Sequence, residues 1–265
     1  MDNRPIGIFD SGFGGLTVLE EYINQLPNEN YIYVGDNARV PYGSKSQETI
    51  IQYARQIVKF LISKDVKLII IACGTASALA FETLKAEFSI PIQTVIEPTA
   101  KQINEKKIGL IATKSTVASK AWENKIHFYH PNCEVFSKAC PLFVPLVEEN
   151  LVDSEIAKLT VSTYLQEFID LQVEALILGC THYPLLLSTI QDFLPTTINI
   201  VNISYAAANE TKEYLTLNNL LCLAKKIPER LAYTTDSVES FKEISKNYCS
   251  FPFHQIEKIN LELYS

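Results

Sequence analysis

The sequence predicts an α/β protein of two similar domains, each built on a mostly parallel sheet. Short, almost wholly apolar runs at residues 6–9 (IGIF), 31–35 (YIYVG) and 67–72 (KLIIIA) alternate with longer segments of helical periodicity. Strands of this kind are typical of parallel sheets that helices cover on both faces. The same alternation occurs a second time along the chain, which predicts the second domain.

Each of these three strands leads into a predicted helix. Apolar residues recur every three or four positions over residues 16–26 (LTVLEEYINQL), 48–63 (ETIIQYARQIVKFLIS) and 75–88 (TASALAFETLKAEF). In an open α/β sheet, ligands bind beyond the carboxyl ends of the strands. We therefore expect functional residues in the loops that join each strand to the next helix.

The pattern restarts about 100 residues later, as expected for an internal duplication. Residues 107–126 (KIGLIATKSTVASKAWENKI) resemble residues 5–23, and residues 176–190 (LILGCTHYPLLLSTI) resemble residues 69–84. Gly7 then corresponds to Gly109 and Cys73 to Cys180, which are shifts of 102 and 107 residues. These nearly equal shifts predict two domains of the same design.

The end of the chain is expected to complete the first domain. Residues 233–249 (YTTDSVESFKEISKNYC) indicate a helix, and residues 254–263 (HQIEKINLEL) indicate a strand. The expected domains are residues 1–97 plus 208–265, and residues 98–207.

Composition and charge narrow the class of protein. A chain of 265 residues with 47% hydrophobic content can form two domains with their own cores. The formal net charge of −7 argues against nucleic acid or an anionic membrane surface as a partner. The sequence has no apolar run near the ~20 residues that span a bilayer and no secretory signal at its start. We expect a cytoplasmic protein.

The six cysteines are expected to be free thiols. They form no CxxC pair and no cluster at zinc spacing, and disulfides are rare in the cytosol. Cys222 lies in an apolar run, residues 218–226 (NNLLCLAKK), that indicates a helix with a buried thiol.

Four loops follow predicted strands and carry most of the polar residues of interest. They are DSGFGG (residues 10–15), GDNARVPYGSKS (35–46), CGT (73–75) and CTHYP (180–184). Glycines in the first loop allow a ligand to approach backbone amides, although their spacing matches neither a dinucleotide nor a Walker fingerprint. In the second loop we expect Arg39 to pair with Asp36 rather than to bind a ligand.

Two cysteines at matching strand ends suit one class of reaction. If the domains face each other, Cys73 and Cys180 lie on opposite sides of one cleft. Inverting a stereocentre beside a carboxylate needs a base on one face and an acid on the other, which a thiolate and a thiol supply. His182 is placed to assist Cys180, and Asp10 to assist Cys73. From the chemistry alone, simple buried packing of both cysteines remains open.

These loops, in this order, resemble those of glutamate racemases, which are cofactor-independent amino-acid racemases. The similar segments span nearly the whole chain: IGIFDSGFGGLTVL, YVGDNARVPYGSKS, ACGTASA, CPLFVPLVEEN and GCTHYPLL. The resemblance implies an active site between two α/β domains, with no pyridoxal phosphate and no metal. It implies proton transfer by Cys73 and Cys180, assisted by Asp10, His182 and Glu148.

The resemblance also implies the substrate and its contacts. Glutamate would be bound by Asp10, Ser11, Tyr42, Gly43, Gly74, Thr75, Thr181 and His182. The family's usual role is to make D-glutamate for bacterial peptidoglycan, often as a homodimer. We expect the same of this chain.

The sequence departs from the family pattern at Gly74. The family usually has Cys-Asn-Thr where this chain has Cys73, Gly74 and Thr75. We expect weaker substrate binding or a substituting group elsewhere, rather than an altered substrate, and expect Gly74→Asn to lower KM. A second, less marked departure from the family pattern is Ile203 before Ser204, where the family often has Asp-Ser.

Three alternatives remain open. The chain could be a two-thiol racemase of aspartate or a related acid, or a catalytically silent paralogue that binds an acidic metabolite. A cysteine hydrolase would use one thiol as its nucleophile and would leave the second cysteine unexplained.

Overall fold

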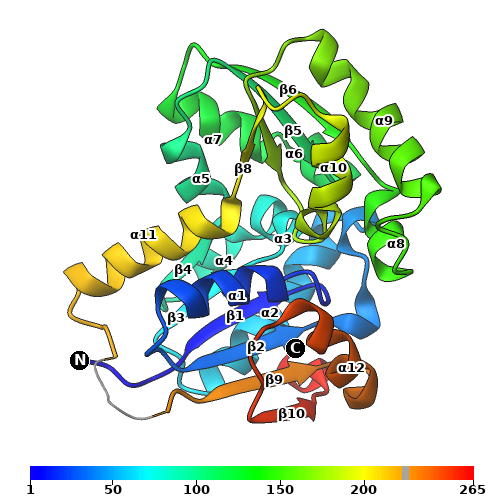
Figure 1. Ribbon diagram of the computed structural model, residues 1–265. Coiled ribbons are helices and arrows are strands. Elements are labelled where there is room, and N and C mark those ends of the chain that lie inside the picture. The colour runs from blue at the N-terminus through cyan, green and yellow to red at the C-terminus, as the bar shows by residue number, and fades with distance from the viewer. Residues whose placement is uncertain (223–226) are drawn as a thin grey trace.

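The computed structural model describes residues 1–222 and 227–265 and contains two parallel sheets, each with helices on both sides (Figure 1). The first sheet has the strand order β10 (Gln255–Lys258), β9 (Arg230–Thr234), β2 (Tyr31–Gly35), β1 (Ile6–Asp10), β3 (Leu68–Ile71) and β4 (Ile92–Thr94). The second has the order β6 (Glu134–Ala139), β5 (Lys107–Ala112), β7 (Ala175–Leu178) and β8 (Asn199–Val201). The α/β fold class is confirmed. We call the part built on the first sheet the first lobe, and the part built on the second sheet the second lobe.

The two sheets share a common core of four strands. The order β2-β1-β3-β4 in the first lobe corresponds to β6-β5-β7-β8 in the second, and all neighbouring pairs are parallel. This order agrees with the internal repeat read from the sequence. Cys73 follows β3 and Cys180 follows β7, so the two cysteines lie at equivalent strand ends. The C-terminal strand β9 pairs with β2, and β10 pairs with β9, which extends the first sheet.

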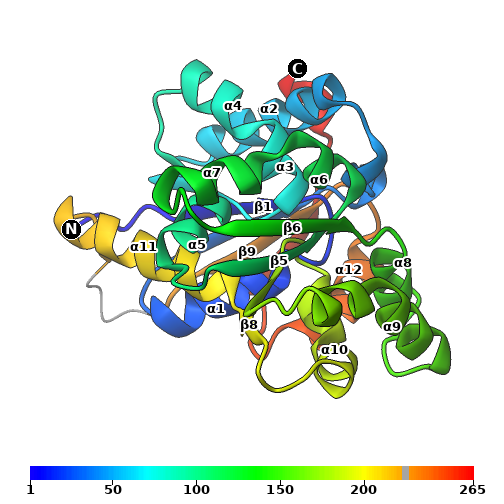
Figure 2. The same cartoon turned by 90° about the horizontal axis from the view of Figure 1, so that it is seen from above.

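Helices cover both faces of each sheet (Figures 1 and 2). Those of the first lobe are α1 (Leu16–Gln25), α2 (Gln47–Ser63), α3 (Gly74–Leu79), α4 (Phe81–Glu87) and α12 (Val238–Tyr248). Those of the second are α6 (Lys114–Ser119), α7 (Ala121–Tyr129), α8 (Phe143–Glu148), α9 (Glu155–Asp170) and α10 (Leu187–Phe193). Single 3-10 turns occur at Asn37–Arg39, Tyr42–Ser44, Tyr183–Leu186 and Leu261–Tyr264. No helix within the described ranges is long and apolar enough to cross a membrane.

Two further helices, α5 (Ile96–Gln102) and α11 (Ile203–Leu217), carry the chain between the lobes and pack against each other (Figure 1). Lys101 of α5 and Glu210 of α11 form an ion pair at 2.7 Å. One cluster of buried apolar side chains includes Ile8 of the first sheet, Ala207 of α11 and Ile108 of the second sheet. The core is therefore continuous across the lobes, so packing at α5 and α11 joins one lobe to the other.

Several sequence-based element boundaries are wrong. The helix expected over residues 75–88 divides into α3 and α4 at Ala80, whose φ of −111° interrupts the helix although no glycine or proline marks the break. Residues 230–234 form β9, so the helix expected from residue 233 begins only at Val238, with Ser237 as its cap. The final strand ends at Lys258.

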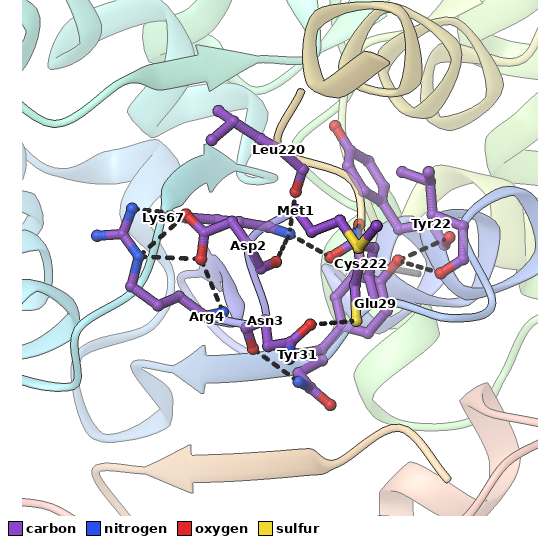
Figure 3. Close-up of polar contacts among 12 residues, drawn as sticks. Met1, Asp2, Asn3, Arg4, Tyr22, Glu29, Tyr31, Lys67, Leu220 and Cys222 are labelled. Atoms are coloured by element: carbon purple, nitrogen blue, oxygen red, sulfur yellow. Dashed lines mark hydrogen bonds and ion pairs between the residues drawn. The ribbon is translucent and has the colours of Figure 1, made fainter. Parts of the chain in front are cut away.

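A buried ion pair anchors the chain at the amino ends of the strands (Figure 3). Lys67 Nζ lies 2.5 Å from Glu29 Oε2 and also donates to the backbone carbonyls of Asp2 and Leu220. The other Glu29 oxygen accepts from the backbone N–H of Cys222. Neither charged side chain is more than 1% exposed. These bonds tie the N-terminus and the segment after α11 to the first sheet.

Cys222 is buried as expected, but its surroundings are not helical. The helix α11 ends at Leu217, and residues 218–222 are outside any helix. Residues 223–226, the rest of the predicted helical run, lie outside the described residues. All six cysteines are free thiols, as expected.

Candidate active site

A cavity of about 210 Å³ lies between the lobes at the carboxyl ends of the strands. Loops after β1, β2 and β3 form one wall, and loops after β5, β6 and β7 form the other. Residues from the sequence prediction that line it are Ser11, Tyr42, Gly43, Cys73, Gly74, Thr75, Glu148, Cys180, Thr181 and His182. The structure thus brings the four loops together. Asp10 is the exception, because it is fully buried behind the cavity wall.

The Cys73 thiol lies at the start of α3 in the first lobe. Its sulfur accepts from the backbone N–H of Ala76 at 3.5 Å and donates to Ser11 Oγ at 3.7 Å. Burial, followed by the nearby charge of Asp10, raises the pKa of Cys73 to about 12. The thiol of Cys73 is therefore protonated at neutral pH.

The Cys180 thiol lies in the second lobe and has a different partner. Its sulfur is 3.9 Å from His182 Nδ1, and His182 Nε2 is 3.5 Å from Glu148 Oε1. Burial of His182 opposes its protonation, but contacts with Cys180 and Glu148 outweigh that penalty. Together with the charges of Cys180 and Asp10, they raise the pKa of His182 to about 10. The resulting imidazolium lies beside the sulfur of Cys180.

Asp10 links the two lobes beneath the cavity. One of its oxygens accepts from the backbone N–H of Gly12, and the other accepts from the Thr181 hydroxyl at 3.2 Å. Burial raises the pKa of Asp10, although the charge of His182 and these hydrogen bonds oppose the shift. Asp10 is not a helix cap, because α1 begins at Leu16 without any side-chain cap.

A model of the Asp/Glu/hydantoin racemase family matches residues 8–211. This chain belongs to that family. Its relatives include the glutamate racemase of Lactococcus lactis subsp. lactis, which is 42% identical over 266 residues, covering 99% of this chain and 98% of the relative. The glutamate racemase of Aquifex aeolicus is 48% identical over 214 residues, covering 79% of this chain and 83% of the relative.

Solved structures give the same family. The glutamate racemase of Francisella tularensis in complex with D-glutamate superimposes with a TM-score of 0.94 at 41% identity and covers 100% of both chains. The aspartate racemase of Picrophilus torridus superimposes with a TM-score of 0.60 at 19% identity, covering 80% of this chain and 94% of that one. The second likeness shows a shared fold alone.

In this racemase-family chain, a set of hydroxyls joins the lobes beside the two thiols. Thr113, at the end of β5, lies 3.0 Å from Thr75 Oγ1 and 2.8 Å from Thr116 Oγ1. Ser115 donates to the carbonyl of Gly43 at 3.1 Å. These contacts join the two lobes in addition to the bond between Asp10 and Thr181.

Sequence reasoning missed part of the racemase cavity. The missed lining residues are Val40, Pro41, Ser44, Thr113, Lys114, Cys140, Pro141, Val144, Pro145 and Tyr183. The repeat contains the signal for Thr113, because a shift of 102 residues places it opposite Ser11. Cys140 begins the similar segment CPLFVPLVEEN, but no pattern in the sequence connects its thiol with the other loops.

The loop after β2 shows which of its polar groups are free to meet a ligand. Arg39 and Asp36 form an ion pair at 2.8 Å, which confirms the structural pairing expected from the sequence. Tyr42 donates its hydroxyl to Asp36 as well. The hydroxyl proton of Tyr42 is therefore used within the loop, and Tyr42 is one of the residues that line the cavity.

Proposed function

We propose that this protein is a glutamate racemase that interconverts L- and D-glutamate. Cys73 and Cys180 each exchange a proton with the α-carbon, one on each face. The observation that carries the proposal is the placement of two thiols at equivalent strand ends on opposite walls of one cavity. Relatives about 40% identical over nearly their full length, including a close structural neighbour with D-glutamate bound, support glutamate as the substrate.

The two thiols have unequal surroundings, which supports a direction for each. Cys180 beside the His182 imidazolium acts as the thiolate and removes the α-proton of L-glutamate. Cys73, a thiol of raised pKa, gives its own proton to the opposite face of the α-carbon. The product is D-glutamate, with a proton on Cys180 and a thiolate on Cys73. The reverse reaction starts from that second state.

Substrate binding relies on dipoles and hydroxyls more than on cations. The charged residues that line the described cavity are Lys114, Glu148 and His182. The hydroxyls of Ser11 and Thr75 and the amides of the loops offer donors to the substrate carboxylates, and such preorganised donors stabilise developing charge. Thr181 gives its hydroxyl proton to Asp10, so its oxygen remains an acceptor for the substrate ammonium group.

The wider role follows from the same family membership. We place the enzyme in the cytoplasm as a homodimer that supplies D-glutamate for peptidoglycan. The relatives' consistent identity as bacterial glutamate racemases supports this role.

The test follows the α-proton in D₂O by NMR, with D-glutamate measured by chiral chromatography. We expect deuterium to enter the α-position as D-glutamate forms from L-glutamate. Inversion of aspartate but not of glutamate would move the substrate to aspartate. Calorimetric binding of glutamate without any exchange would instead indicate a silent binding protein.

Substitution of each cysteine tests the two-thiol mechanism. Cys73→Ala and Cys180→Ala should each abolish racemisation, because each variant lacks the acid for one direction and the base for the other. Cys133→Ala removes a buried thiol outside the cavity and serves as the control. Near-normal turnover in either of the first two variants would show that the mechanism is wrong.

A further inference from the structure

Three glycines of the first lobe face the second lobe across the cleft. A Cβ built on Gly14 would lie 2.5 Å from His182 Nδ1, and one on Gly43 would lie 2.7 Å from Thr113 Cβ. A Cβ on Gly74 would lie 2.2 Å from the carbonyl oxygen of Gly179. The lobes therefore approach each other at bare α-carbons, with no room for a side chain.

Gly74 differs from the other two glycines because it faces backbone. All three nearest atoms to its built Cβ belong to Gly179 and Cys180 of the second lobe. A side chain can rotate away from an added methyl group, but the carbonyl of Gly179 sits at the end of β7 and moves only with its strand. Its neighbouring N–H donates to Ile111 at 2.8 Å, which holds that segment to β5.

The contact also joins the two segments that carry the proposed proton carriers. Gly74 follows Cys73 in the chain, and Gly179 precedes Cys180. Each residue is bonded to the loop position of one thiol, so their separation determines how far apart the thiol-bearing loops lie. We infer that the bare α-carbon of Gly74 sets the closing distance of the two lobes and is a positioning residue for both thiols. The inference rests on the proposed racemase function of this cavity.

The contact between Gly74 and Gly179 reverses the expectation that Gly74→Asn lowers KM. Ordinary contacts of a Cβ begin at 3.4 Å, so any side chain here must push the Gly179 carbonyl away by about 1 Å. The asparagine side chain cannot reach a substrate in this cleft without first widening it. We now expect Gly74→Asn to lower kcat rather than to improve KM.

Gly74→Ala is the sharpest test, because it adds the Cβ and nothing else. A misplacement of about 1 Å can cost on the order of 100-fold in turnover, and we expect kcat for glutamate to fall by about that factor. Alkylation by iodoacetamide, mapped by mass spectrometry, should become several-fold faster at Cys73 and Cys180. Cys133, outside the cavity, should react as in the wild type and serves as an internal standard.

Gly7→Ala is the matched control. It adds a Cβ to a buried glycine of the same lobe, where the nearest atoms are side-chain atoms of Leu61 and Val66, away from the cleft. Its kcat and the alkylation of Cys73 and Cys180 should stay within twofold of wild type.

The melting temperature separates lobe opening from misfolding. No atom of the first lobe is among those nearest to the added methyl, and alanine favours the first position of α3, so Gly74→Ala should melt at or above the wild-type temperature. Melting below Gly7→Ala would mean that the strain stays within the fold, which would overturn the inference. So would a kcat within twofold of wild type with unchanged alkylation. A wild-type enzyme without activity on glutamate would refute the proposed function, while alkylation and melting would still test Gly74.

Discussion

The pairing of Glu148 with His182 makes a quantitative prediction. Glu148→Gln removes a negative charge 3.5 Å from His182 Nε2 and keeps the shape of the side chain. At that distance two unit charges interact by about 1 kcal/mol in water and about 5 kcal/mol at an effective dielectric of 20. The Glu148 side chain is 35% exposed, which places the pair near the lower value. We expect the pKa of His182 to fall by about one unit, from about 10 to about 9.

The measurement is an NMR titration of the free protein labelled at the histidine Cε1 carbons. The chain has four histidines, and His182→Gln assigns the resonance of interest. Glu149→Gln, at the neighbouring exposed carboxylate, is the matched control and should leave the titration unchanged. If the His182 titration stayed near 10 in Glu148→Gln, or moved equally in Glu149→Gln, the charge pairing would not govern this imidazole.

The same pair makes stability depend on pH. The pKa of His182 is higher in the folded chain, about 10, than the usual histidine value of about 6.5, so folding favours the protonated form. The stabilisation is fully present below about pH 6.5 and is lost as the pH rises through about 10. Glu148→Gln should therefore lower the free energy of unfolding by about 1 kcal/mol at pH 6 and by nearly nothing above pH 10. Urea denaturation at both pH values checks the sign.

Two further predictions concern the hydroxyls between the lobes and the buried ion pair. Thr113→Val removes the hydroxyl that contacts Thr75 and Thr116, and should lower the free energy of unfolding by about 1–2 kcal/mol and raise KM. Steady-state kinetics and urea denaturation test this, and an unchanged KM would mean that the hydroxyls do not shape the cavity. Lys67→Met leaves Glu29 buried without its partner (Figure 3) and should lower the free energy of unfolding by about 3–5 kcal/mol. Turnover per folded molecule should be unchanged, because Lys67 and Glu29 lie at the amino ends of β3 and β2, whereas the cavity lies at the carboxyl ends of the strands. Adding Glu29→Gln should recover part of the loss, and a cost below 1 kcal/mol would contradict the reasoning.

Sequence patterns predicted the parts of the fold that depend on local periodicity. The strands around Ile8 and Ile70 are continuous apolar runs because both faces of each sheet are covered, and such runs have few other interpretations. The repeat then gave the equivalence of Cys73 and Cys180, which placed both thiols at the same edge of their sheets. The break in the helix at Ala80 was not predicted, because no glycine or proline marks it in the sequence.

The contents of the cavity were predictable only in part. Loops that directly follow strands were found, since the carboxyl ends of parallel strands share an edge. Glu148 was found by resemblance alone, because it sits at the end of the short helix α8 and no spacing relates it to His182. The contact of Gly74 with Gly179 depends on how α5 and α11 position one lobe against the other. Local sequence periodicity does not predict that arrangement.

The scaffold is duplicated, but its two thiols have unequal partners. In the proposed mechanism, this inequality explains how one site holds one thiol and one thiolate. Two identical halves would give both cysteines the same surroundings, and two interacting thiols of equal pKa would share a proton with no fixed resting state. Here the last residue of β1 differs from its counterpart at the end of β5. Asp10 is buried near Cys73 and raises the pKa of that thiol, whereas Ala112 occupies the equivalent position in the second lobe. The second lobe instead has His182 beside Cys180, held by Glu148. In the mechanism proposed above, burial and Asp10 on one side, and the His182 imidazolium on the other, are the differences that would make Cys73 the proton donor and Cys180 the base toward L-glutamate.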